Sequence, residues 1–318
     1  MSVSMRAAYA QLALSMILVG LSLPASKLVI AHVPPLTTAW LRFVMVAVLL
    51  APVVLGGALS QRAWTGWPRG GRDWTSLTLL ALFGMVLFNV FLLYGLRETS
   101  AVAAGILTST IPAMTALCAA LILRERIGAG SLAAIALAVL GILSLNLQSG
   151  GHSGAEAAAS SNDSLAGNAL VFGAVVSEGL YGVFARRLGG RVAPLTLTFL
   201  ANALSAALIG PAAWATAGGF DPAAVPAGIW LLFVASGLTG GLMAVVLWMR
   251  GIAHVPANRA GLFTGMIPAA GVLAAVLFLG EDFTAGHAAG LACVLAGIAL
   301  GTGALRLPSR KASSPTPP

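Results

Sequence analysis

One carboxylate, Glu178 in the stretch VVSEGLYG, lies within a long apolar run of this 318-residue chain. It precedes Arg186 by eight residues, or about 12 Å along a helix. An ionised carboxylate at that depth in a membrane is costly, so we expect Glu178 to face a cavity. Two interpretations stay open: a site for proton coupling or cation binding, or a protonated glutamate bonded to a neighbouring helix.

Three further side chains in apolar runs, Asn89, Tyr181 and Trp248, offer polar or aromatic contacts to a bound solute. The same groups commonly join transmembrane helices to one another, so each also has a structural interpretation. We place all three with Glu178 in the predicted substrate-binding or coupling set.

Two prolines, Pro112 and Pro268, stand inside apolar runs of helical length. A proline lacks an N–H group and deprives the carbonyl four residues earlier of its helical partner. Those carbonyls belong to Thr108 and Thr264, which we expect near the middle of their spans and include in the predicted substrate-binding or coupling set. Either the prolines are hinges for alternating access with the freed carbonyls facing a cavity, or they are structural kinks satisfied locally.

Residue patterns of enzymes and metal sites are missing from the sequence. It contains no HExxH and no GxSxG motif, and no cysteine–histidine cluster suggests a metal. The stretch VASGLTGG resembles a small-residue serine site, but no histidine shares its depth. No basic stretch is interleaved with aromatic residues, as in nucleic-acid binding. We therefore expect no catalytic residue, no cofactor, no metal and no nucleic-acid partner.

The composition indicates that the solvent of this chain is a lipid bilayer. Hydrophobic residues make up 58% and charged residues 8%, with mean hydropathy +0.95. A soluble domain carries about 25% charged residues, because it must meet water on all sides. The net charge of +8 fits basic residues that flank membrane spans on the cytoplasmic side.

Ten apolar runs are long enough to cross a membrane as helices, the form in which the backbone satisfies its own hydrogen bonds in lipid. They cover residues 9–30, 36–56, 76–96, 99–123, 130–147, 165–185, 194–214, 229–249, 257–279 and 287–305. We expect an all-α integral membrane protein with a first five-span unit at 1–148 and a second at 165–305. A Gly/Ser-rich external linker at 149–164 separates them, and a disordered cytoplasmic tail follows at 306–318.

The basic residues predict the orientation. With the N-terminus in the cytoplasm, all 17 lysines and arginines except Lys27, Arg42 and Arg97 fall on the cytoplasmic side. We therefore expect a multi-pass protein of the inner (plasma) membrane with both termini in the cytoplasm.

An internal duplication underlies the ten runs. The stretch IPAMTALCAALILRE recurs as IPAAGVLAAVLFLGE, and eight of the fifteen positions are identical. Pro112 pairs with Pro268 and Glu125 with Glu281, both 156 positions apart, and glycines between residues 84 and 141 recur at that offset. Towards the N-terminus the offset becomes 159, as for Gly20 and Gly179. A shared frame of this length indicates two copies of one unit.

Five spans per copy is an odd number, so the second copy enters the membrane from the opposite face. Two inverted five-helix repeats are typical of secondary transporters. The flanking charges agree, because Glu125 lies between two arginines whereas its counterpart Glu281 lies between Gly280 and Asp282.

The chain resembles the drug/metabolite transporter superfamily, specifically its EamA-type ten-span members. The resemblance rests on GLSLPASK at the end of the first span, LRF at residues 41–43, the two proline–glutamate pairs and the glycine spacing after each glutamate. It covers residues 11–305, although Val19-Gly20 stands where these members often have Trp-Gly. It implies transport of small metabolites, often export of amino acids or related compounds.

These observations together predict a secondary transporter that exports a small metabolite by alternating access, with protons as the coupling ion through Glu178. A lipid-linked solute flippase is the alternative within transport, and an intramembrane enzyme is a lesser one.

Overall fold

The computed structural model describes residues 5–55, 67–124, 132–133, 135–137, 139–141, 164–188, 191–252, 254–255 and 261–301. Within these residues the regular structure is entirely helical. Its elements in chain order are α1 (Met5–Ile30), α2 (Pro35–Leu55), α3 (Gly71–Leu79), η2 (Leu80–Leu87), α4 (Phe88–Glu98), α5 (Ala101–Thr108), α6 (Ile111–Leu123), α8 (Leu165–Leu188), α9 (Pro194–Thr216), η3 (Pro222–Ala224), α10 (Ala227–Ser236), η4 (Gly237–Met243), α11 (Ala244–Ile252), η5 (Gly261–Gly265), α13 (Met266–Leu279) and α14 (Ala285–Gly301).

Seven helical segments are long and apolar enough to cross a membrane, and two shorter apolar helices follow near the C-terminus. The long segments cover 5–30, 35–55, 71–98, 101–122, 165–185, 195–216 and 227–248, and the shorter ones cover 263–279 and 285–300. Nine of the ten predicted runs thus coincide with apolar helices. The run predicted at 130–147 lies mostly outside the described residues, as do most of the linker and the whole C-terminal tail.

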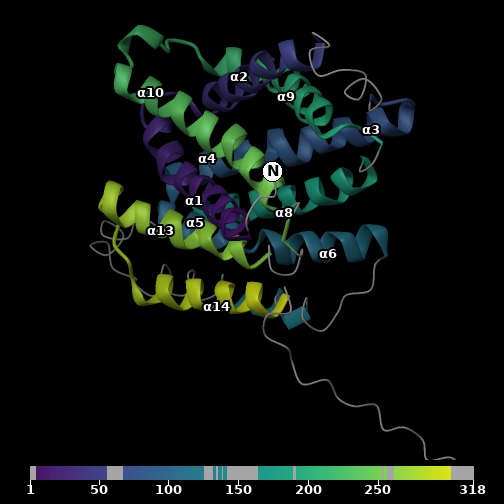
Figure 1. Cartoon of the computed structure of the whole chain (residues 1–318). Coiled ribbons are helices and arrows are strands. Elements are labelled where there is room, and N and C mark those ends of the chain that lie inside the picture. The colour runs from purple at the N-terminus through teal and green to yellow at the C-terminus, as the bar shows by residue number, and fades with distance from the viewer. Residues whose placement is uncertain are drawn as a thin grey trace, which may run out of the picture.

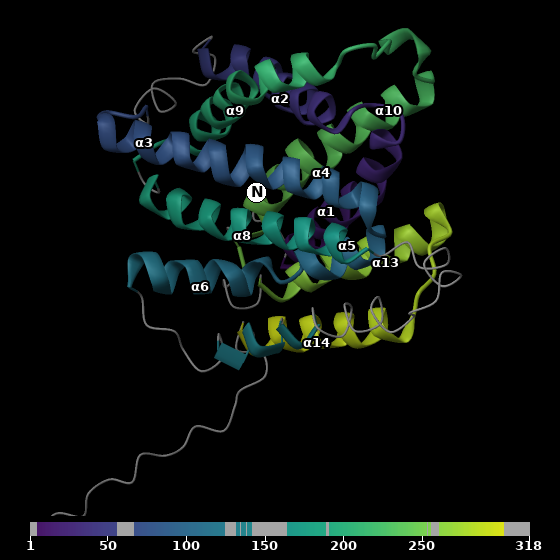
Figure 2. The ribbon, with the colours of Figure 1, turned by 180° about the vertical axis from the view of Figure 1, so that it is seen from behind.

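The helices form one bundle with α2 and α9 packed side by side at one edge and α14 at the opposite edge (Figures 1 and 2). Between these edges α1 packs against α11 and α13, whereas α8 packs against α4 and α6. The largest buried apolar cluster joins residues of α1, α2, α4, α5, α8, α9, α13 and α14. The packing therefore connects the two halves of the chain throughout and does not separate them into two cores.

Two spans are interrupted just before their prolines. A turn at Ser109–Thr110 interrupts the fourth span between α5 and α6, and Pro112 lies in the first turn of α6. The ninth span begins as the 3₁₀ segment η5, and Pro268 follows near the start of α13. A proline is well tolerated at the start of a helix, where its missing N–H has no helical partner to lose. The sequence predicted kinks at the prolines themselves; the structure places each interruption upstream of its proline.

The third and eighth spans each contain a π-helical segment, η2 and η4, which the sequence did not predict. The two segments lie at residues 80–87 and 237–243, close to the 156-residue offset of the duplicated sequence. π-Helical turns are rare and concentrate at functional sites, so their recurrence in the same part of both halves indicates a shared requirement.

The helices that contain the duplicated stretch end in the same way. Arg124 ends α6 with φ 56°, and Gly280 ends α13 with φ 64°, both in the left-handed region. Glycine adopts that conformation freely, whereas Arg124 is the one described non-glycine residue with positive φ. Both copies of the duplicated unit therefore end this helix with the same left-handed backbone turn, although one copy has arginine and the other glycine at that position.

Glycine contacts recur between the halves as well. An added side chain at any of four glycines would be in tight or overlapping contact with α1 or α8: Gly84 with Tyr181, Gly240 with Ser22, Gly95 with Val171 and Gly251 with Leu12. Gly84 and Gly240 are 156 positions apart, and their partners Tyr181 and Ser22 are 159 positions apart. The same two offsets relate Gly95 to Gly251 and their partners Val171 to Leu12. The two offsets found in the sequence thus correspond to two equivalent sets of helix contacts.

Candidate functional site

Glu178 lies in the middle of α8, about 15 Å from the nearer end of this helix. Its side chain is half-buried, and no hydrogen bond or ion pair within the described part of the chain holds it. Buried carboxylates in structural roles are normally paired or hydrogen-bonded. A half-buried carboxylate without a partner among the described residues is suited to bind a proton or a positively charged group.

Packing on both sides of Glu178 fixes the helix that carries it. The next residue, Gly179, lies so close to α6 that an added Cβ would be 2.8 Å from Met114 and 3.1 Å from the sulfur of Cys118. One turn further on, Tyr181 lies against Gly84 of η2. Residues three apart on a helix are neighbours, so Tyr181 and Glu178 share the region between η2 and α6.

Asn89 and Thr108 are buried and engaged within their own helices. The amide nitrogen of Asn89 donates to the carbonyl of Met85 at 2.9 Å. The hydroxyl of Thr108 donates to the carbonyl of Ala104 at 2.8 Å. Both residues lie on helices that pack against α8.

Hydroxyl groups surround the interruption before Pro112. Ser109 donates to the carbonyl of Gly105 at 2.6 Å, and Thr110 donates to that of Leu107 at 2.7 Å. Such bonds satisfy backbone carbonyls where the helical ladder stops. Neither bond reaches the carbonyl of Thr108, which Pro112 leaves without a helical partner, so a hinge and a structural kink both remain predictions for these prolines.

Trp248 lies apart from this group. It packs near the N-terminal end of α1, against the cluster of Ala8, Leu12 and Val255. Thr264 is within η5 at the start of the ninth span. Of the six residues predicted for the substrate site, the structure thus brings Glu178, Tyr181, Asn89 and Thr108 into neighbouring elements, while Trp248 belongs to an aromatic cluster at one end of the bundle.

A close crossing of α1 and α13 matches that of α8 and α6. An added Cβ on Gly20 would be 2.9 Å from Ala270 and 3.1 Å from the backbone nitrogen of Gly271. Gly20 corresponds to Gly179, and Ala270 corresponds to Met114. Each half of the chain therefore inserts a glycine of its first helix against the proline-bearing helix of the other half.

An ion pair connects the two halves at one end of the bundle. Nζ of Lys27, in the last turn of α1, is 2.8 Å from Oε1 of Glu281, just after α13. The same ammonium group donates to the carbonyl of Thr99 at 2.9 Å. The side chain of Glu281 is only 5% exposed, so the carboxylate is shielded from water, whereas the side chain of Lys27 is 25% exposed.

Glu281 also caps a helix. Its two carboxylate oxygens accept the backbone N–H groups of Ala101 and Val102, each at 2.9 Å, at the start of α5. The side chain of Ser100 accepts the next N–H group, from Ala103. A carboxylate at a helix N-terminus satisfies orphan donors and is favoured by the helix dipole. Glu281 therefore holds the ends of α1, α5 and α13 together.

This role of Glu281 was missed in the sequence. A glutamate just after an apolar run is expected where the span meets water, and a lysine near the end of a span is expected either as an interface anchor or as a charge at an external gate. Both residues face each other instead. The recurrence of a glutamate at the same place in both stretches was the available signal, but the partner could not be identified without the tertiary structure.

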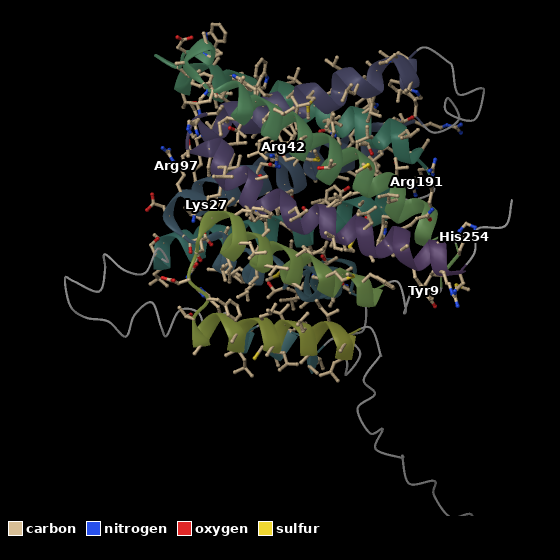
Figure 3. The ribbon with its side chains drawn as sticks, turned by 60° about the vertical axis from the view of Figure 1, so that its left-hand side comes forward. Tyr9, Lys27, Arg42, Arg97, Arg191 and His254 are labelled. Carbon is tan, nitrogen blue, oxygen red and sulfur yellow. The ribbon has the colours of Figure 1, made fainter. Side chains whose placement is uncertain are left out.

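Arg42 lies between the two ends of the bundle, whereas Lys27 and Arg97 lie at one end and Arg191 and His254 at the other (Figure 3). Its Nη2 donates to the hydroxyl of Ser26 at 3.2 Å, while its buried Nε has no partner within the described residues. The sequence predicts that Arg42, six residues into its span, extends its long side chain to the external interface. The structure instead shows this side chain in contact with α1.

No group of three or more potential metal ligands occurs within the described residues. Glu178 and Tyr181 share one region of the bundle, whereas Asn89 and Thr108 are buried and bonded within their own helices.

Comparison with known proteins identifies the family to which the chain belongs. The pattern of the EamA-like transporter family matches residues 6–147 and again 165–302. The uncharacterized transporter YetK of Bacillus subtilis (strain 168) is 31% identical over 291 residues, covering 92% of this chain and 85% of YetK. An uncharacterized transporter of Archaeoglobus fulgidus is 27% identical over 292 residues, covering 90% and 95%.

A solved crystal structure of a protein has the same fold, with a TM-score of 0.61 and 19% sequence identity over 92% of this chain and 96% of that one. At this identity the likeness concerns the fold alone.

Proposed function

The chain belongs to the EamA-like transporter family, a multi-pass group of membrane transporters, and on that premise we propose that it exports a small metabolite by alternating access. The observation that carries the proposal is the Lys27–Glu281 ion pair, which joins the two family-matched segments at one end of the bundle. A carrier needs such a contact to close one end while the other is open, and it must break when the carrier turns over.

The proposal includes two inverted five-helix repeats related by the 156- and 159-residue offsets. The paired glycine contacts, π-helical segments and left-handed helix ends support it. In inverted-repeat carriers the substrate lies near the repeat interface at mid-membrane, and one repeat rocks against the other. We place both termini in the cytoplasm and the protein in the inner membrane, on the distribution of lysine and arginine.

Proton coupling through Glu178 is part of the same proposal. An accessible carboxylate without a partner can exchange a proton with a cavity, and its charge then alters the affinity for a solute. The neighbouring groups Tyr181, Asn89 and Thr108 contact the solute in this account. The interruptions before Pro112 and Pro268 act as the hinges.

Amino acids or related compounds are the proposed cargo. Two charged side chains inside the bundle, Arg42 and Glu178, have no oppositely charged partner within the described residues. A solute that carries both an amino group and a carboxylate offers the groups that complement them.

Counterflow into liposomes tests the function. Purified protein is reconstituted into vesicles loaded with single amino acids, nucleosides or organic cations, and uptake of the labelled compound is followed. We expect counterflow with at least one amino-acid-like compound. Vesicles that show verified insertion and no counterflow with any of the three classes would count against the proposal.

A further inference from the structure

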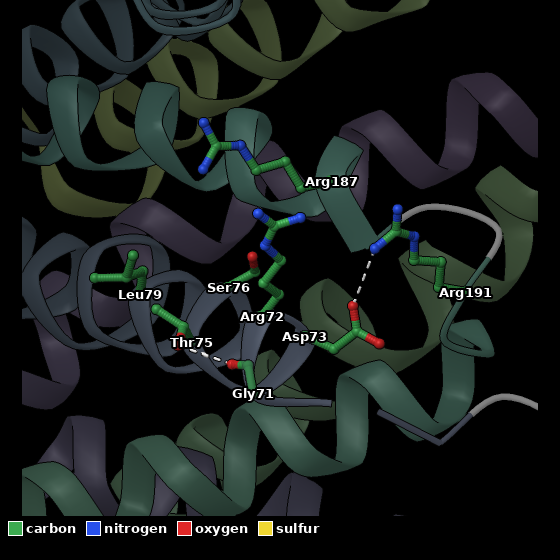
Figure 4. A pocket seen from close by; sticks show the side chains of 8 residues that line it. All are labelled: Gly71, Arg72, Asp73, Thr75, Ser76, Leu79, Arg187 and Arg191. Atoms are coloured by element: carbon green, nitrogen blue, oxygen red, sulfur yellow. Dashed lines mark hydrogen bonds and ion pairs between the residues drawn. The ribbon is translucent and has the colours of Figure 1, made fainter. Parts of the chain in front are cut away.

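A basic pocket lies at the end of the bundle opposite Lys27, between the third and sixth spans. It has a volume of about 860 Å³ and is formed by the start of α3, the end of α8 and Arg191 just after it. Its lining residues are Gly71, Arg72, Asp73, Thr75, Ser76, Leu79, Arg187 and Arg191. Figure 4 shows Arg72 and Arg187 extending from the two helices that face each other across the pocket.

The charges of this pocket are not balanced within the described structure. Arg191 is bonded to Asp73 at 3.3 Å, which neutralises the acidic group of the pocket. Neither Arg72 nor Arg187 has an acidic partner among the described residues. The guanidinium group of Arg187 lies instead over the ring of Phe184, 5.8 Å from its centre, and this contact orients it. Two arginines are therefore free to bind an anion.

The backbone adds to the positive potential. The helix that starts at Gly71 continues through η2 and α4 to Glu98, and its N-terminal dipole points into the same region. Gly70, at the N-cap position, provides no side-chain hydrogen bond. Planar guanidinium groups and exposed helix N–H groups are both well matched to phosphate oxygens.

We propose that this pocket binds the headgroup of an anionic phospholipid. It lies where two neighbouring spans end, at the level at which a lipid phosphate meets the protein. Leu79 provides an apolar wall at the side where α3 continues into the bundle, and Trp74, 44% exposed on the same turn, is typical of a membrane interface. Basic pockets between transmembrane helices bind lipid headgroups in this way.

Binding of phosphatidylglycerol to the delipidated full-length protein tests the proposal. Titration of the protein in phosphatidylcholine nanodiscs with phosphatidylglycerol, followed by native mass spectrometry, gives the affinity. Each of Arg72→Gln and Arg187→Gln should weaken binding about fivefold, the effect of one basic residue near a lipid surface. Arg97→Gln removes the same charge at the other end of the bundle and should leave the affinity unchanged.

Two further arms make the test decisive. Arg187→Lys keeps the charge and should lose less affinity than Arg187→Gln, which separates an electrostatic role from a folding defect. Soluble glycerol phosphate should fail to displace the lipid at concentrations that saturate a phosphate site. Equal binding by the double variant R72Q/R187Q and the wild-type protein, or full displacement by glycerol phosphate, would overturn the proposal.

Discussion

Lys27 and Glu281 lie 254 residues apart in the chain and 2.8 Å apart in the structure. Glu281 uses the same carboxylate to accept two backbone N–H groups of α5, so one side chain connects three helices. The pair therefore combines an ion pair with a helix cap, and removal of either partner would leave buried polar groups without hydrogen-bond partners.

Glu281→Ala should destabilise the protein by about 3 kcal/mol or more, because it strands a half-buried ammonium group and two helix N–H groups. Thermal unfolding in detergent measures the effect. The charge-swapped variant K27E/E281K should not recover stability, because lysine at position 281 cannot accept the N–H groups of Ala101 and Val102. Full recovery by the swap would show that the helix cap contributes nothing.

A reversible cross-link at the same place should arrest transport. In a variant in which Cys118 and Cys293 are replaced by alanine, Lys27→Cys and Glu281→Cys should be joined by a bismaleimide whose spacer contains a disulfide, because the two long side chains that meet in the ion pair leave their backbones too far apart for a direct disulfide. Counterflow should stop on cross-linking and return on reduction, because the closed end can then no longer open. The variants with only Lys27→Cys or only Glu281→Cys are the controls, and the reagent should not change their transport.

Gly20→Ala should impair both stability and transport. An added methyl group would come 2.9 Å from Ala270 and still closer to the carbonyl of Ile267, so α1 and α13 would be forced apart. Overpacking of this kind costs about 1–3 kcal/mol. Gly105→Ala is the matched control, since an added Cβ there meets nothing within 4 Å. Equal melting temperatures for the two variants would refute the tight crossing.

Glu178→Gln should remove the dependence of transport on an imposed pH gradient. The substitution keeps the size of the side chain but removes its ability to exchange a proton. Uptake into proteoliposomes with and without a gradient provides the measurement. Glu98→Gln, an exposed glutamate at the end of α4, should retain the dependence. An unchanged response in the Glu178 variant would exclude coupling through this residue.

Orientation can be tested on residues of two described loops. In the cysteine-free background, Asp221→Cys should react with an impermeant maleimide added to whole cells, and Arg191→Cys should react only after the cells are opened. The reverse pattern would invert the proposed topology.

Most of the helices could be predicted from the sequence because the chain is built to lie in lipid. Apolar runs of about 20 residues predict spanning helices on length alone, and nine of them coincide with apolar helices in the structure. The paired stretches that begin at Ile111 and Ile267 also predicted equivalent elements, and both helices end in the same left-handed turn.

The side-chain partners were not predictable in the same way. Hydropathy describes a whole run and does not say which face of a helix meets another helix. Glu281 follows an apolar run and looks exposed, yet the unsatisfied N–H groups of α5 draw it into the protein. Trp248 lies in an apolar run like Tyr181, but it packs with an aromatic cluster at the end of α1. The π-helical segments depend on packing between spans and leave no local sequence signal.

Metabolite profiling of the culture medium tests whether the protein exports a small metabolite. Medium from cells that produce the protein is compared with medium from otherwise identical cells that lack it. We expect one compound or a small related group, of the amino-acid class, to accumulate outside only when the protein is present. Identical profiles, with the protein verified in the membrane, would contradict it.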